Sequence, residues 1–133
     1  MSLVEEALVT RLTSVAALTA LVGSRISPLR APENEPVPYV VYQRIAGTRE
    51  QAFGADPGLT RARFQVSAWD ASYSGVKAVQ DQLRLALERW RGTVSGVEVL
   101  DTFIESDLDD HEPEPERYGS MLDITVIYRE AVA

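Results

Sequence analysis

A cluster of prolines constrains the fold more than any other feature of the sequence. Four of the seven prolines lie within eleven residues: Pro28, Pro32, Pro36 and Pro38. A proline fixes its own φ angle, lacks an amide donor and drives the preceding residue toward an extended conformation. Neither a helix nor a central strand is therefore expected over residues 28–38. We predict an extended arm over residues 27–38 and interpret it as a contact with a neighbouring subunit.

Composition restricts the classes of protein to consider. The chain has 133 residues, of which 45% are hydrophobic and 25% charged, as is ordinary for one folded domain. A net charge of −7 disfavours electrostatic binding to nucleic acid or to an anionic membrane. The absence of cysteine excludes disulfides and thiolate chemistry. No apolar run approaches the ~20 residues of a membrane span, and no secretory signal pattern begins the chain, so we expect no membrane partner.

Apolar periodicity predicts two helices and four strands. Helices are expected at about 2–22, with a candidate break at Thr13-Ser14, and at about 72–90; strands are expected at about 39–47, 60–70, 97–104 and 119–129. One stripe of the second helix should pack on the apolar sheet face; it comprises Tyr73, Val76, Val79, Leu83, Leu87 and Trp90. The predicted fold is one α+β domain over residues 1–133. It consists of a four-stranded, largely antiparallel sheet with two helices packed on one face, in the order α-β-β-α-β-β.

Two polar segments are expected to project from this domain as loops. Residues 48–59 contain a Pro-Gly turn, with Arg49 and Phe53 as candidate contact residues, although a plain solvated loop is an equal alternative. Residues 105–118 form the second predicted loop. It carries seven carboxylates, which we consider candidate interaction residues: Glu105, Asp107, Asp109, Asp110, Glu112, Glu114 and Glu116.

The acidic segment does not fit a metal site or a catalytic centre. Counted from Asp107, a calcium loop needs glycine at its sixth position and glutamate at its twelfth, where this chain has Glu112 and Tyr118. The sole histidine, His111, lies among carboxylates and has no serine in a nucleophile-elbow pattern to activate. Phosphate-binding glycine motifs are also absent. We therefore predict no catalytic residues, no metal, no cofactor and no enzymatic activity.

Arginines gather on or beside the first two predicted strands. They are Arg44, Arg49, Arg61 and Arg63. Two interpretations remain open. We favour salt bridges to neighbouring acids, and the alternative is a contact between subunits, since arginine is enriched at interfaces. Trp69 and Trp90 are expected to pack in the core and not to form ligand platforms.

The order of several segments resembles the tail completion, or tail-to-head joining, proteins of long-tailed bacteriophages and prophages. The most specific part runs from Ala-Leu-Val-Gly-Ser-Arg-Ile through the proline arm to Pro-Tyr-Val-Val-Tyr-Gln-Arg-Ile. The strand Ala-Arg-Phe-Gln-Val-Ser-Ala-Trp and the closing Leu-Asp-Ile-Thr-Val-Ile-Tyr-Arg-Glu add to it. The resemblance spans nearly the whole chain.

The resemblance implies a structural virion protein that terminates the tail tube and joins it to the head connector. It implies a ring, usually a hexamer, whose partners are copies of itself, the tail tube protein and a head-completion or connector protein. Such a subunit lies at the neck or top of the tail and is assembled in the host cytoplasm. Carboxylates of residues 105–116 would then line the lumen, where they repel DNA passing through without specific binding, or form an axial docking surface.

Two other functions stay open at this point. One is a small cytosolic ligand-binding protein or enzyme subunit on a ferredoxin-like scaffold, because fold alone does not decide function. It requires a concave apolar pocket with converging polar groups. The other is an adaptor or inhibitor that adds a strand at an exposed sheet edge and forms a defined heterodimer.

Overall fold

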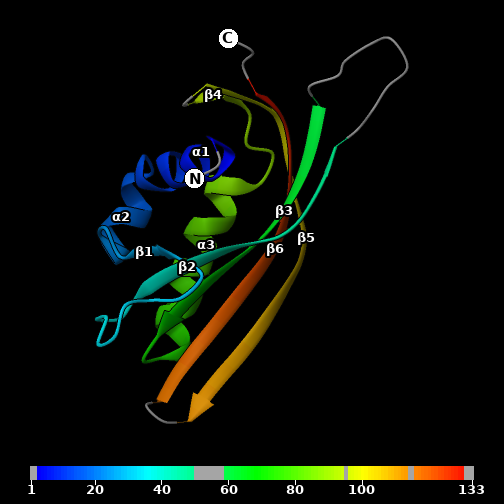
Figure 1. The fold of residues 1–133 in the computed structure, drawn as a ribbon. Helices are drawn as coiled ribbons and strands as arrows, with labels where there is room; N and C mark the ends of the chain where they lie inside the picture. Colours follow the sequence, from blue (N-terminus) through cyan, green and yellow to red (C-terminus); the bar gives the residue numbers. More distant parts are fainter. Residues whose placement is uncertain (1–2, 50–58, 95, 114–115, 131–133) are drawn as a thin grey trace.

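The computed structural model describes residues 3–49, 59–94, 96–113 and 116–130. Within these residues a six-stranded sheet curls toward three helices that cover one of its faces (Figure 1). The helices are α1 (Leu3–Thr13), α2 (Ala16–Val22) and α3 (Tyr73–Leu87), and the strands are β1 (Ile26–Pro28), β2 (Tyr39–Arg49), β3 (Leu59–Asp70), β4 (Gly92–Val94), β5 (Val97–Pro113) and β6 (Glu116–Glu130). The strand order is β1-β2-β3-β6-β5-β4. Since β1 and β2 pair in parallel and the other neighbours are antiparallel, the sheet is mixed.

The predicted four-stranded, largely antiparallel sheet with two helices is therefore wrong. The missed strands, β1 and β4, have three residues each, which is too short for an alternating pattern to register in a sequence. Pro28 is tolerated in β1 because β1 lies at the edge of the sheet, where a missing amide donor costs no ladder bond. The first predicted helix is also divided. α1 ends at Thr13, at the break that the sequence marked, and α2 follows it.

Helix α3 packs its apolar stripe on the sheet, as predicted. Ser72 begins the helix, because its hydroxyl accepts a hydrogen bond of 3.1 Å from the Gly75 amide. Leu83 and the facing Phe64 are fully buried, together with other members of both predicted stripes: Val76, Leu87, Ala62, Val66 and Ala68. Tyr73 departs from the prediction, since its side chain is 51% exposed. The core thus lies between α3 and the curled sheet, with apolar residues of α1 and α2 completing it.

Residues 105–113 and 116–118, predicted as a loop, are strands. Strand β5 continues to Pro113 and β6 begins at Glu116, with Asp109 paired to Ser120 and Glu112 to Arg117. Aspartate and glutamate are rare in strands, so the local composition favoured a loop, whereas pairing with β6 decides the conformation. Residues 114–115, with Glu114, lie outside the described residues.

The structure describes the predicted arm, residues 27–38, and part of the predicted loop, residues 48–59. Residues 27–28 belong to β1, and residues 29–38 lead to β2 without helix or strand. The Leu29 amide donates to the Tyr42 carbonyl at 2.8 Å, and the Arg25 Nε donates to the Pro38 carbonyl at 2.8 Å, so both ends of this arm are held to the domain. Of residues 48–59, only 48, 49 and 59 are described, and they extend β2 and β3. Phe53 lies outside the described residues.

Candidate interaction surfaces

The C-terminal part of β5 and the N-terminal part of β6 form an acidic hairpin. We call residues 105–113 and 116–118 the distal hairpin; it extends past the start of α3 (Figure 1). The six predicted carboxylates that the structure describes are all exposed: Glu105, Asp107, Asp109, Asp110, Glu112 and Glu116. Register places Asp107 beside the buried Leu122, on the helix-covered face, and Asp110 beside Gly119, on the opposite, helix-free face. Carboxylates therefore lie on both faces of the hairpin.

Helix α3 holds the hairpin through one of these carboxylates. The Lys77 ammonium donates to Asp109 Oδ1 at 2.6 Å, and the Tyr73 hydroxyl donates to Asp109 Oδ2 at 3.0 Å. The Lys77 contact, followed by the Tyr73 contact, lowers the pKa of Asp109, and the same ion pair raises the pKa of Lys77. The negative charge of Asp109 is thus partly used within the subunit and less available to a partner.

Aromatic rings add to this attachment. The Tyr118 ring meets Tyr73 edge-on, with centroids 6.2 Å apart, and lies 4.9 Å from the His111 ring. The Tyr118 hydroxyl donates to Glu116 at 2.8 Å, and this contact with a carboxylate raises the pKa of Tyr118. Contacts with α3 therefore hold the distal hairpin in place. The sequence did not indicate this attachment, because Tyr73 was assigned to the core.

His111 contacts an aromatic ring and a neighbouring carboxylate. Its ring lies 4.9 Å from the Tyr118 ring, and its backbone amide donates to Asp110 Oδ1 at 2.8 Å. In the described part of the chain no group of three or more histidine, aspartate or glutamate side chains is arranged to hold a metal ion. The described acids of the distal hairpin form a charged surface.

The proline arm borders a groove on the helix-free face. The groove has a volume of about 290 Å³ and lies between Leu29–Ala31 of the arm and strand residues that include Tyr39, Trp69 and Met121. Trp69 is half-buried here and packs on Gly119, where an added Cβ would lie 2.7 Å from its ring. Its expected place in the core is thus only partly right, whereas Trp90 is buried. Within the arm, Pro28, Pro32 and Pro36 are exposed, and Pro38 is half-buried.

The arginines have different environments. Arg63 forms an ion pair of 3.3 Å with Asp123 across the strands, in agreement with the favoured salt-bridge interpretation. Arg61 also has an interaction partner. Arg44 is exposed and has no ion-pair partner among the described residues. For Arg49 only the backbone, at the end of β2, is described.

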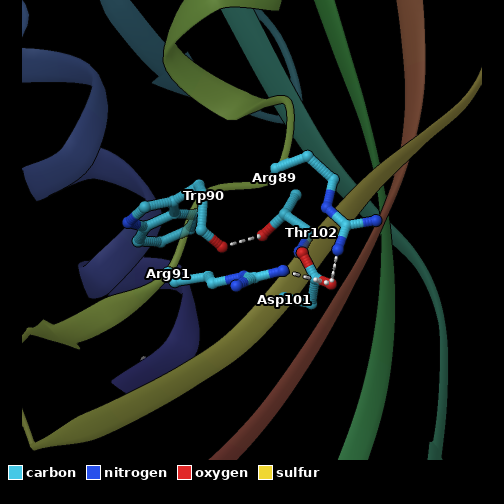
Figure 2. Close-up of polar contacts among 5 residues, drawn as sticks. All are labelled: Arg89, Trp90, Arg91, Asp101 and Thr102. Carbon is cyan, nitrogen blue, oxygen red and sulfur yellow. Dashed lines mark hydrogen bonds and ion pairs between the residues drawn. The ribbon is translucent and has the colours of Figure 1, made fainter.

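A polar cluster at the end of α3, which the sequence did not indicate, fixes the following turn to β5 (Figure 2). Arg89 and Arg91 form ion pairs of 2.7 and 3.4 Å with Asp101, whose side chain is 16% exposed. Burial would raise the pKa of Asp101, but the Thr102 amide and the two guanidinium groups outweigh it and lower the pKa. The Thr102 hydroxyl donates to the Trp90 carbonyl at 3.0 Å. These contacts are internal and serve the fold.

None of the described helices has the length and apolar character needed to cross a membrane. A search of curated protein sequences returned no significant match. The fold is similar to a chain of the virion of a native gene transfer agent particle, with a TM-score of 0.71 and 17% identity over 92% of this chain and 91% of that one. A second solved chain, designated only by a sequence identifier, gives a TM-score of 0.59 and 18% identity over 100% of this chain and 98% of that one.

The family comparison covers most of the sequence. The family model of tail completion protein gp17 matches residues 6–129, from α1 to the end of β6. This span includes the segments on which the resemblance to phage tail completion proteins was based. The chain therefore belongs to the tail completion protein gp17 family of bacteriophage structural virion proteins.

Proposed function

We propose that this protein is a ring subunit that terminates the tail tube of a long-tailed phage or prophage and joins it to the head connector. The observation that carries the proposal is the family match over residues 6–129. The similar chain in the gene transfer agent particle is part of a virion, which supports a place for this fold in an assembled particle. The protein acts without catalysis, at the neck or top of the tail, after assembly in the host cytoplasm.

Its partners in this proposal are copies of itself in a hexamer, the tail tube protein below and a head-completion or connector protein above. DNA passes through the lumen without specific binding. The formal net charge of −7 per subunit supports this, because carboxylates repel phosphates and leave the genome free to slide.

We assign the distal hairpin to an axial docking surface. Asp107 and Asp110 lie on opposite faces of the hairpin, so its carboxylates do not form one wall of a lumen. The hairpin also reaches past the start of α3 (Figure 1), where another ring would be stacked. An acidic projection of this kind suits a partner with a basic surface.

The proline arm contributes a second contact in the proposal. Exposed Pro28, Pro32 and Pro36 reduce the conformational freedom of the free arm, so less entropy is lost when it docks on a neighbour. Arg49 and Phe53, from residues 48–59, are further proposed contacts.

The docking role is tested with a variant in which the seven carboxylates of residues 105–116 become amides. In a phage that lacks its own copy of the gene, this variant should fold but leave separate heads and tails, as counted by electron microscopy and by infectious titre. A matched control changes exposed acids of α3 and the following residue to amides: Asp81 and Glu88. Full infectivity of the hairpin variant would show that the hairpin charges are not used for joining.

The ring is tested separately with the unmodified protein. Sedimentation and negative-stain electron microscopy, with and without tail tubes, should reveal closed rings. A strict monomer under all of these conditions would contradict the proposed function.

A further inference from the structure

Two strand edges of the sheet are only partly covered. β1 pairs with residues 40–42 of β2, and β4 pairs with residues 97–99 of β5. Further backbone hydrogen bonds reach β2 at Val40 and Tyr42, and β5 at Thr102. Within the described chain, residues 43–49 of β2 and 103–113 of β5 therefore have no strand beside their outer edges. Free amide and carbonyl groups on such edges favour pairing with another strand.

Each open edge carries an exposed apolar side chain. Ile45 on β2 is 41% exposed and Leu108 on β5 is 62% exposed. Leu108 pairs with Met121 on the helix-free face, and Ile45 lies at a register irregularity between Arg44 and Ala46, where it has no partner on β3. A contact between the two edges would remove both side chains from water, which is favourable.

On the helix-covered face, the two edges carry opposite charges. Arg44 is in register with Phe64, and Asp107 is in register with Leu122; both of these partners are buried under the helices. Neither Arg44 nor Asp107 has an ion-pair partner among the described residues. The charges on the two edges are thus opposite in sign and lie on the same face of the sheet.

We propose that residues 43–49 of β2 in one copy pair with residues 104–110 of β5 in the next copy, so that the sheet continues from subunit to subunit. This pairing rests on the ring proposed above. β2 and β5 run in opposite directions within the sheet, so copies related by an axis near the strand direction meet as antiparallel neighbours. Two different edges form the contact, which makes it head-to-tail and suited to closing a ring.

The apolar and charged side chains restrict the register further. Pairing Ile45 with Leu108 brings the two exposed apolar side chains together and places Arg44 across from Asp109 and diagonal to Asp107. The end of the distal hairpin, residues 111–113 and 116–118, stays beyond the paired segment and free for axial docking. The contact therefore uses the base of the hairpin and leaves its tip to the partner ring.

A charge exchange tests the pairing. Arg44→Glu should raise the protein concentration needed for half-maximal ring formation by roughly tenfold or more, because it sets like charges against each other. Asp107→Arg should do the same. The double variant R44E/D107R should restore assembly, since every contact again joins opposite charges. Far-ultraviolet circular dichroism and the thermal midpoint establish that each variant is folded. The matched control is Arg84→Glu, at an exposed position of α3.

Thiol cross-linking provides a second measurement that does not depend on charge. The chain has no cysteine, so I45C/L108C introduces the only two thiols. Oxidation should give a covalent ladder up to the ring size on a non-reducing gel. L85C/L108C, with a thiol on α3 at the 64% exposed Leu85 position, should give no ladder.

The outcomes separate this pairing from the function on which it rests. Rings of unmodified protein that are unaffected by R44E and cross-link equally in both cysteine pairs would overturn the pairing and leave the proposed function intact. Such a result would mean that the charged side chains and the register irregularities of β2 and β5 keep these edges unpaired. Absence of rings in the unmodified protein, with or without tail tubes, would overturn both. Loss with R44E, recovery with R44E/D107R and the selective ladder together support the pairing.

Discussion

The Lys77 ammonium lies 2.6 Å from Asp109 Oδ1 and joins α3 to a strand 32 residues further along the chain. The contact sets the base of the acidic hairpin against the helix that packs on the sheet. Tyr73, one turn earlier on α3, donates to the same carboxylate and meets the Tyr118 ring. A hairpin attached in this way has a defined position relative to α3, which suits the proposed docking to another ring.

Lys77→Gln should destabilise the protein in a pH-dependent manner. The folded pKa of Asp109 is below its ordinary value of 3.8, so the pair stabilises the fold above that pH and is lost as the pH falls through the lowered pKa. The folded pKa of Lys77 is above 10.5, so the contribution is full below 10.5 and is lost as the pH rises through the raised pKa. Thermal midpoints of wild type and K77Q should therefore differ at pH 7 and converge in strong acid.

The matched control for that comparison is Arg84→Gln, which breaks the more exposed Arg84–Asp81 pair on the same helix. It should change the midpoint less at pH 7. Hydrogen exchange of residues 105–113 should rise in K77Q and not in R84Q. A K77Q effect of the same size at every pH would contradict the role of Asp109.

Leu83→Ala should lower the free energy of unfolding by about 2 to 5 kcal/mol, because Leu83 is fully buried between α3 and the sheet. Chemical denaturation with an unchanged slope measures the loss. Leu85→Ala is the control on the same helix, since Leu85 is 64% exposed and its truncation leaves no cavity. Equal denaturation midpoints for L83A and wild type would exclude this packing.

Thr102→Val should cost about 1 to 3 kcal/mol, because it removes the buried hydroxyl that donates to the Trp90 carbonyl and keeps the side-chain shape. The matched control is Thr93→Val on β4, where the side chain is exposed. Urea denaturation of both variants measures the difference. A stability of T102V equal to that of T93V would mean that the Trp90 carbonyl finds another donor.

Deletion of residues 31–36 should weaken ring formation more than folding, if the proline arm clasps a neighbour as proposed. The domain ends of the arm are held by Leu29 and Pro38, outside the deleted segment. Sedimentation measures the ring fraction, and the thermal midpoint measures folding. Equal loss of both properties would identify the arm as part of the fold alone.

The long elements were predictable from local patterns. Alternation in residues 60–70 and the stripe around Leu83 predicted β3 and α3, because a side chain's burial follows directly from the period of its element. The segments carrying the family resemblance were also readable in the sequence, and the family match over residues 6–129 confirms it. Short strands such as β1 gave no periodic signal.

The sequence by itself determined the apolar faces, the absence of cysteine chemistry and the family. Only the tertiary structure decided that the acidic residues 105–113 form a strand, since their conformation depends on pairing with β6 and on Lys77 of a separate helix. It also decided which edges stay open, and so placed Arg44 and Asp107 at opposite ends of one sheet. Strand pairing joins residues far apart in the chain, and no local pattern contains that information.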